Sequence, residues 1–142
     1  MTATLLEARQ GIADVLRLVD GLDTVYAYIP ASPTPPCAIV LMPPVWTPDF
    51  YISNSTAWQA DIPVQVLVQA GSNDSADRTL CGFLEPSGGS SVSAAFDNNP
   101  SLNSVLNGYA IVRTVTDIGM IAGPDDGVRY LSATFNIDVH TT

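Results

Sequence analysis

The sequence predicts an α+β domain: one mostly antiparallel or mixed β-sheet of about five strands, with two or three helices on one face. Two periodicities support this prediction. Apolar residues recur every three or four positions near the N-terminus, as in an amphipathic helix, and two later segments alternate apolar and polar residues, as half-buried strands do. With 142 residues, of which 46% are hydrophobic, the chain has the length and composition of a single folded domain, residues 1–142.

The first helix is expected over residues 4–20. Thr4 and Glu7 have the spacing of a capping box, in which each side chain accepts a hydrogen bond from the backbone N–H of the other residue. Gly21 is the expected end of the helix, because glycine enters the left-handed conformation without steric cost. The apolar stripe of this helix consists of Leu5, Ala8, Ile12, Val15 and Val19.

Five strands are expected, over residues 24–29, 37–42, 56–69, 108–118 and 128–139. The segment 37–42 is continuously apolar, which is typical of a strand buried on both faces. The segments 56–69 and 128–139 alternate, so one face of each should pack against helices. Pro63 lies inside the first of these two segments, which predicts that part of one edge of that strand is free or bulged.

The remaining segments are expected to cover and connect the strands. Residues 74–84 carry a helical stripe, and residues 91–96 can form a short helix. Residues 119–127 contain a Gly-Pro-Asp-Asp-Gly turn that joins the last two strands. The predicted order is therefore one helix, three strands, one or two helices, and two strands.

Charge excludes several classes of partner. The chain has 14 acidic residues, five arginines and no lysine, and its formal net charge is −9. Binding to nucleic acid through its phosphates requires clustered lysine and arginine, and so does binding to an anionic membrane surface. The charge-free stretch 24–48 contains seven prolines, which cannot continue a helix, so no membrane span is expected and the protein is expected to be soluble. Cys37 and Cys81 are expected to be reduced, buried thiols rather than a disulfide.

The sequence reveals no catalytic, cofactor-binding or metal-binding residues, and we expect no enzymatic activity and no cofactor. His140, the only histidine, is third from the carboxyl end, where a fraying tail is a poor place for a general base. The segment 88–91 lacks the spacing of a nucleophile elbow, and no lysine is present for a phosphate-binding loop. Acidic residues near positions 74 and 125 lack the spacing of a calcium loop, and nothing selects one pair of carboxylates for acid–base chemistry.

Two segments are candidates for contacts with a partner. The expected loop 45–55 carries Trp46, Phe50 and Tyr51 but only one charge, which is typical either of an interface or of a lid folded back on the core. Met120 and Ile121 are apolar residues near the turn of the last hairpin, which indicates either an intersubunit contact or an ordinary capped hairpin.

A set of short features in fixed order resembles the tail terminator proteins of long-tailed, siphovirus-type phages that infect actinobacteria. No feature is a sharp motif, but together they cover nearly the whole chain. The aromatic segment 46–51 and the absence of lysine depart from the family pattern. The features are Val19-Asp20-Gly21-Leu22, Val25-Tyr26, Pro35-Pro36, the run 38–44, Val66-Leu67-Val68, a helix with Asp77, Leu80 and Leu84, the run 87–92, Ala94-Ala95, Leu102, Tyr130-Leu131, Ala133 and Phe135.

The resemblance implies a structural virion protein that assembles in the host cytoplasm and resides at the tail or neck. Its copies would form a sixfold ring on the last ring of tail-tube subunits, end tube polymerisation and contact head–tail connector or neck proteins. A head-to-tail ring needs two different patches on each subunit. Genomic DNA would pass through the lumen without specific binding, since an acidic lining repels phosphates, and Asp125 and Asp126 are the candidate lining residues.

Two other interpretations remain open from the sequence. A head–tail connector (neck or stopper) subunit could have similar size and acidity. A small acidic enzyme or ligand-binding domain would have polar residues that meet only in three dimensions.

Overall fold

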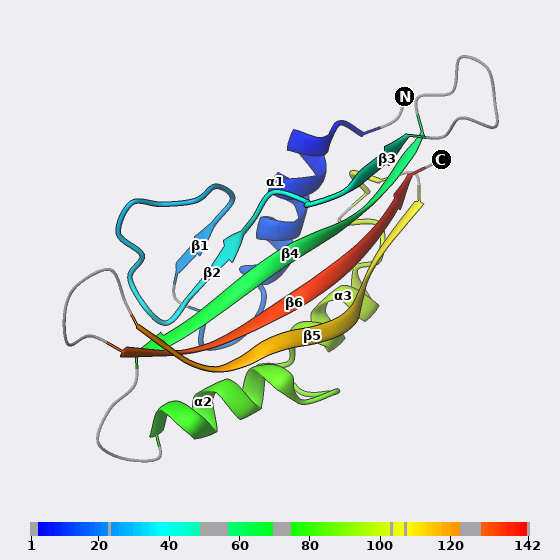
Figure 1. Ribbon diagram of the computed structural model, residues 1–142. Coiled ribbons are helices and arrows are strands. Elements are labelled where there is room, and N and C mark those ends of the chain that lie inside the picture. The colour runs from blue at the N-terminus through cyan, green and yellow to red at the C-terminus, as the bar shows by residue number, and fades with distance from the viewer. Residues whose placement is uncertain are drawn as a thin grey trace.

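The computed structural model describes residues 3–22, 24–48, 57–69, 75–102, 104–106, 108–122 and 129–141. Within these residues it confirms the predicted α+β class, with one mixed sheet of six strands and three helices (Figure 1). None of the described helices has the length and hydropathy needed to cross a membrane. The elements in chain order are α1 (Leu5–Leu16), β1 (Thr24–Tyr26), β2 (Cys37–Val40), β3 (Trp46–Pro48), β4 (Trp58–Gln69), α2 (Ser75–Leu84), α3 (Val92–Asn98), β5 (Gly108–Ala122) and β6 (Arg129–Thr141).

Helix α1 begins as predicted and ends earlier. Both hydrogen bonds of the capping box between Thr4 and Glu7 are present. After the C-cap residue Arg17, the backbone N–H groups of Leu18 and Val19 bond to carbonyls three residues back instead of four, so the chain tightens into turns. Gly21 does adopt a positive φ of 94°, but in the turn that follows the helix and not as its cap.

The strand order is β1-β2-β4-β6-β5, and the β1–β2 pair is parallel whereas the other pairs are antiparallel. The sixth strand, β3, was not expected, because its residues lie in the segment predicted to be a loop. The 12-residue β4 is much longer than the four-residue β2, so its first part is open to a second partner on that edge. Strand β3 pairs with this part, from Trp46 opposite Ala60 to Pro48 opposite Trp58.

Pro63 lies in the gap between these two partners of β4, as the sequence predicted. Strand β2 pairs with residues 64–67 of β4 and β3 pairs with residues 58–60. The carbonyl of Pro63 accepts a hydrogen bond from Leu41 N at 2.9 Å, so the proline nitrogen faces the same edge. The missing N–H therefore falls where neither strand pairs with β4.

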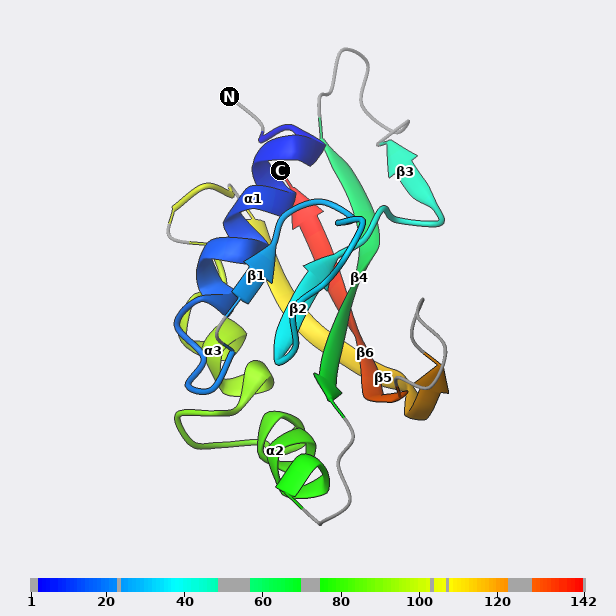
Figure 2. The same cartoon turned by 90° about the vertical axis from the view of Figure 1, so that its left-hand side faces the viewer.

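All three helices lie on one side of the sheet (Figure 2). The core between them and the sheet includes Ile12 and Leu16 from α1, Phe83 from α2, Phe96 from α3, and the inward residues of β4 and β6. On the other side the described residues bury a small second cluster, which explains why Leu67 interrupts the polar alternation of β4. This cluster consists of Cys37, Ile39, Leu67 and Tyr130.

The β5–β6 hairpin is longer than predicted, because β5 continues to Ala122 and β6 to Thr141. Two irregularities interrupt β5, between Val112 and Thr114 and between Thr116 and Gly119. Strand β5 is an edge strand, and its end turns away from the helices (Figure 2). Near its start, Ala110 N donates a hydrogen bond to Pro100 O at 2.8 Å, so the segment after α3 covers that part of the edge.

Both cysteines are free, as predicted, but only Cys37 is buried. The expectation of two buried thiols is wrong for Cys81, which lies on the solvent side of α2. Burial raises the pKa of the Cys37 thiol from 9.0 to about 11. Because the thiolate is the reactive form, the two cysteines should differ sharply in reactivity.

A titration with Ellman's reagent at pH 8 should modify one thiol per chain rapidly and the second only after unfolding in urea. The Cys81→Ser variant should lose the rapid phase. The folded state keeps the Cys37 proton up to about pH 11, whereas the unfolded state loses it near pH 9, so this group lowers the free energy of unfolding as pH rises through that interval. Two rapid thiols in the native protein would contradict the buried position of Cys37.

Candidate functional site

The face of the sheet opposite the helices is open, and its side chains form cross-strand rows. Because successive side chains of a strand alternate between faces, the register places the polar residues of β4, β6 and β5 side by side. From the carboxyl end of β6 toward the hairpin turn, the rows are Gln59–His140–Tyr109, Asp61–Asp138–Ile111, Pro63–Asn136–Thr114, Gln65–Thr134–Thr116, Leu67–Ser132–Gly119 and Gln69–Tyr130–Ile121.

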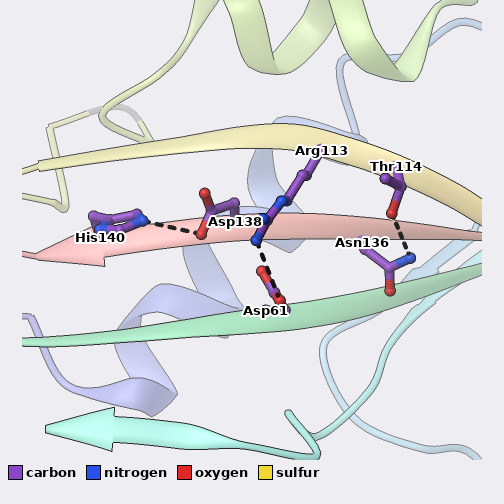
Figure 3. Close-up of polar contacts among 6 residues, drawn as sticks. All are labelled: Asp61, Arg113, Thr114, Asn136, Asp138 and His140. Atoms are coloured by element: carbon purple, nitrogen blue, oxygen red, sulfur yellow. Dashed lines mark hydrogen bonds and ion pairs between the residues drawn. The ribbon is translucent and has the colours of Figure 1, made fainter.

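Two carboxylates oppose each other in the second row. Asp61 and Asp138 are direct partners in the β4–β6 ladder, and like charges in this position destabilise a sheet. Arg113 occupies the bulge of β5, and its side chain reaches across β6 to Asp61, at 3.9 Å between Nη1 and Oδ2 (Figure 3). His140 Nε2 lies 3.1 Å from Asp138 Oδ1. Each carboxylate therefore has its own nitrogen partner.

His140 is an ordered residue of β6, and the expectation that it belongs to a fraying tail is wrong. The next residue, Thr141, holds the strand end: its hydroxyl accepts from Trp58 N at 2.7 Å and donates to Trp58 O at 2.9 Å. The ring of Tyr109 stacks on the imidazole, with centroids 4.7 Å apart and planes at 19°. A Cβ atom at position 108 would overlap the carbonyl of His140, so Gly108 permits this close approach.

These residues form part of a hollow with a volume of about 470 Å³, which we call the open-face hollow. It spans four strands, from β3 across β4 and β6 to β5. Charged groups of both signs lie among apolar side chains, which suits the hollow to recognition of a partner surface with mixed chemistry. Its lining residues are Val45, Thr47, Gln59, Ala60, Asp61, Ile111, Arg113, Asp138 and His140. Among the described residues, no three His, Cys, Asp or Glu side chains are grouped so that they could hold a metal ion.

Trp46 lies beside this hollow, in β3. Its ring packs against the buried Trp58, with centroids 6.5 Å apart, and 49% of the residue remains exposed. One part of Trp46 thus packs on the core, as expected of a lid, and the other part faces solvent, so the interface role stays a prediction.

Met120 and Ile121 lie in β5 and not in the turn itself. They are 55% and 37% exposed, and Ile118 nearby is 56% exposed. Met120 pairs with Leu131, whose side chain faces the core, whereas Ile121 pairs with Tyr130 on the open face. The end of the hairpin therefore exposes apolar side chains on both faces.

Four predicted residues, Phe50, Tyr51, Asp125 and Asp126, lie outside the described residues. Sequence reasoning missed the charged row and the Tyr109–His140 stack. It did assign Asp61 and Asp138 to the polar faces of their strands, but the register that makes them partners and the bulge that brings Arg113 to them are not encoded in either pattern alone.

No protein-family model matches this chain, and no curated protein shows significant sequence similarity to it.

Proposed function

We propose that this chain is a tail terminator subunit of a long-tailed phage, a structural protein whose copies form a sixfold ring. The ring would cap the tail tube, end its polymerisation and join it to the head–tail connector or neck proteins. The observation that carries the proposal is that two separate parts of a strongly acidic chain each expose apolar side chains, in addition to exposed apolar residues elsewhere such as Tyr28 and Ile29. The ordered sequence features that resemble the terminator family support the same assignment.

The two parts suit a ring subunit because they differ from each other. One contains Trp46 and Val45 beside the open-face hollow, and the other contains Ile118, Met120 and Ile121 at the end of the hairpin. Monomeric proteins expose few contiguous apolar patches, and exposed patches mark interaction sites. Two unlike patches permit head-to-tail contacts, which close into rings when the rotation between copies allows.

The charge of the chain suits passage of DNA through such a ring. With 14 acidic residues, five arginines and no lysine, the subunit repels phosphates and cannot trap the genome electrostatically. Asp125 and Asp126 remain the proposed lumen residues.

The open-face hollow favours a second candidate, a small ligand-binding domain. Its volume lies in the range of small-molecule sites, and its polar groups converge from four strands. A connector subunit is the other alternative. Virion assembly distinguishes all three.

Loss of the gene from its phage should yield particles with over-long tails, because no ring ends tube polymerisation. Electron microscopy of lysates measures the tail lengths directly. A connector subunit would instead give tails of normal length that fail to join heads, and a ligand-binding domain would leave both tail length and joining unchanged.

The Trp46→Asp substitution should abolish assembly into rings or onto tail tubes while the chain stays folded, because a charge would replace the half-exposed indole beside the hollow. Light scattering measures assembly, and a thermal melt followed by circular dichroism reports folding. Leu18→Asp is the matched control, since Leu18 is a similarly exposed apolar residue that follows α1 on the helix side. Loss of the cooperative melt in Trp46→Asp would show that the indole serves the core and would contradict the interface role. Phe50→Asp tests the neighbouring aromatic residue in the same way.

A further inference from the structure

We propose that copies of this chain contact one another through opposite edges of the sheet, with Asp117 and Ile118 of one copy docked beside helix α1 of the next. The central contact is an ion pair between Asp117 and Arg9. The contact rests on the proposed ring, for which it supplies the two surfaces. The surface that receives Asp117 and Ile118, which we call the α1-edge patch, consists of Leu6, Arg9, Met42 and Trp46.

Two hydrogen bonds hold the start of α1 beside the edge formed by β2 and β3. Trp58 Nε1 donates to Ala3 O at 2.9 Å, and Arg9 Nη2 donates to Val40 O at 2.7 Å. Leu6 lies between these two anchors and three residues from Arg9, so it is a neighbour of Arg9 on the helix surface. Leu6 is 60% exposed, which leaves this part of the α1-edge patch accessible.

The strand side of the α1-edge patch is also apolar. Trp46 pairs with the core residue Ala60 and therefore lies on the helix side of the sheet, where 49% of it is exposed. The ladder of β2 continues through the hydrogen bond from Leu41 N to Pro63 O. Met42, two residues after the core residue Val40, therefore continues on the helix side, and it is 54% exposed.

Arg9 is the cation of this patch, and it lacks a carboxylate partner. Within the described residues its guanidinium makes one hydrogen bond, to Val40 O, and its Nε is buried without an acceptor. None of the ion pairs among the described residues includes Arg9. A guanidinium has five N–H donors and forms its strongest hydrogen bonds with carboxylates. The α1-edge patch therefore suits an occupant that combines a carboxylate with an apolar side chain.

The second bulge of β5 presents this combination at the opposite edge of the sheet. Asp117 and Ile118 fall between the pairs that Thr116 and Gly119 form with β6, so two residues of β5 stand opposite one of β6. Asp117 has a φ of 54°, and both residues are exposed, Ile118 by 56%. A bulge redirects side chains away from the regular ladder, which makes these two available to another molecule.

Among the described carboxylates, Asp117 is distinguished by its surroundings. Asp14, Asp61 and Asp138 have nitrogen partners in side chains of the same copy, and Glu7 accepts from Thr4 N. Of the other described carboxylates, Asp117 alone is adjacent in sequence to a large exposed apolar residue. These other carboxylates are Asp20, Asp77, Glu85, Asp97 and Asp117.

The two surfaces cannot meet within one copy. In the strand order β1-β2-β4-β6-β5, three spacings separate β2 from β5, which is about 14 Å at about 4.8 Å for each (Figure 1). Leu41 N faces β4, so Val40 O and the Arg9 guanidinium bound to it lie at the outer edge of β2. A contact between unlike edges of successive copies is heterologous and propagates around a ring.

Both edges disfavour the alternative contact, in which the backbones of two copies pair. At β2, Arg9 occupies the outward carbonyl of Val40. At β5, two bulges interrupt the ladder, and the hydrogen bond from Ala110 N to Pro100 O covers the edge near its start. Such features protect edge strands from forming continuous sheets with other chains. The contact between copies is therefore made by side chains.

Disulfide trapping tests the contact directly. In a Cys81→Ser background, a chain carrying both Leu6→Cys and Ile118→Cys should oxidise to a ladder of covalent oligomers that ends at the closed ring. Chains with one of the two substitutions should form no disulfide alone and should form covalent dimers when mixed. Denaturing electrophoresis without reductant measures all three results. Leu18→Cys paired with Ile118→Cys is the matched control that should stay monomeric, since Leu18 is 59% exposed.

The outcomes separate the contact from the proposed function. Rings seen by light scattering without trapping would overturn the choice of surfaces and leave the terminator proposal standing. Dimers from either single variant alone would indicate a two-fold contact and would overturn the choice as well. Trapping between Leu6→Cys and Leu18→Cys would assign the acidic side of the contact to Asp20 instead. A ladder from a protein whose loss leaves tail length unchanged would support the contact and refute the terminator function, and a strict monomer at all concentrations would refute both.

Charge substitution provides an independent measurement. Asp117→Asn should raise the concentration at which half of the protein is assembled by about tenfold or more, because Arg9 loses its carboxylate while asparagine keeps the side-chain shape and tolerates a positive φ. Asp97→Asn makes the same change at an exposed position of α3 and should have a much smaller effect. Light scattering measures assembly, and a circular-dichroism melt reports whether each variant folds.

Exchange of the two charges completes the test. Arg9→Glu should weaken assembly at least as much as Asp117→Asn, and a chain with both Arg9→Glu and Asp117→Arg should assemble again. Equal effects of Asp117→Asn and Asp97→Asn, or failure of the exchange in a chain that melts cooperatively, would show that Arg9 and Asp117 do not pair. Asp117→Asn leaves the hydrogen bond between Arg9 and Val40 in place, so its result decides the question if Arg9→Glu does not fold.

Discussion

The pairing of β4 with β6 is the constraint on which the rest of the structure depends. Eleven consecutive residue pairs join these two central strands, from Gln59 with His140 to Gln69 with Tyr130. A slip of one residue would turn every side chain of one strand to the opposite face. The register that places Ile62 opposite Ile137 in the core also places Asp61 opposite Asp138 on the open face. The unfavourable meeting of two carboxylates is thus a consequence of good packing on the other side, and Arg113 and His140 offset it.

The parts of the fold that depend on local chemistry could be predicted from the sequence. The capping box of α1, the buried faces of β4 and β6 and the free position of Pro63 all follow from neighbouring residues or from a period of two. Strand β3 could not be predicted, because it forms only where the longer β4 extends past β2. The sequence also could not predict that His140 lies in a strand and not in a frayed tail. Its position depends on the hydrogen bond of Thr141 to Trp58 and on the stacking of Tyr109, and these contacts join residues that are distant in sequence.

When two copies of this chain approach each other, their net negative charge and their exposed apolar side chains act at different distances. Repulsion between copies of like net charge is largely screened beyond a Debye length, about 8 Å at physiological ionic strength, and acts at shorter separations. Within that distance the few arginines and the apolar side chains decide which orientation is productive. An association governed in this way is slow between free copies and selective in geometry.

The covered and bulged edge of β5 has a consequence for the protein before assembly. A 15-residue edge strand with apolar residues would ordinarily be a template for amyloid-like growth, particularly at high protein concentration. The carbonyl of Pro100 and the two interruptions leave only short stretches of free backbone on that edge. The same long hairpin can therefore expose apolar side chains while its backbone leaves few N–H and C=O groups free to pair with another strand.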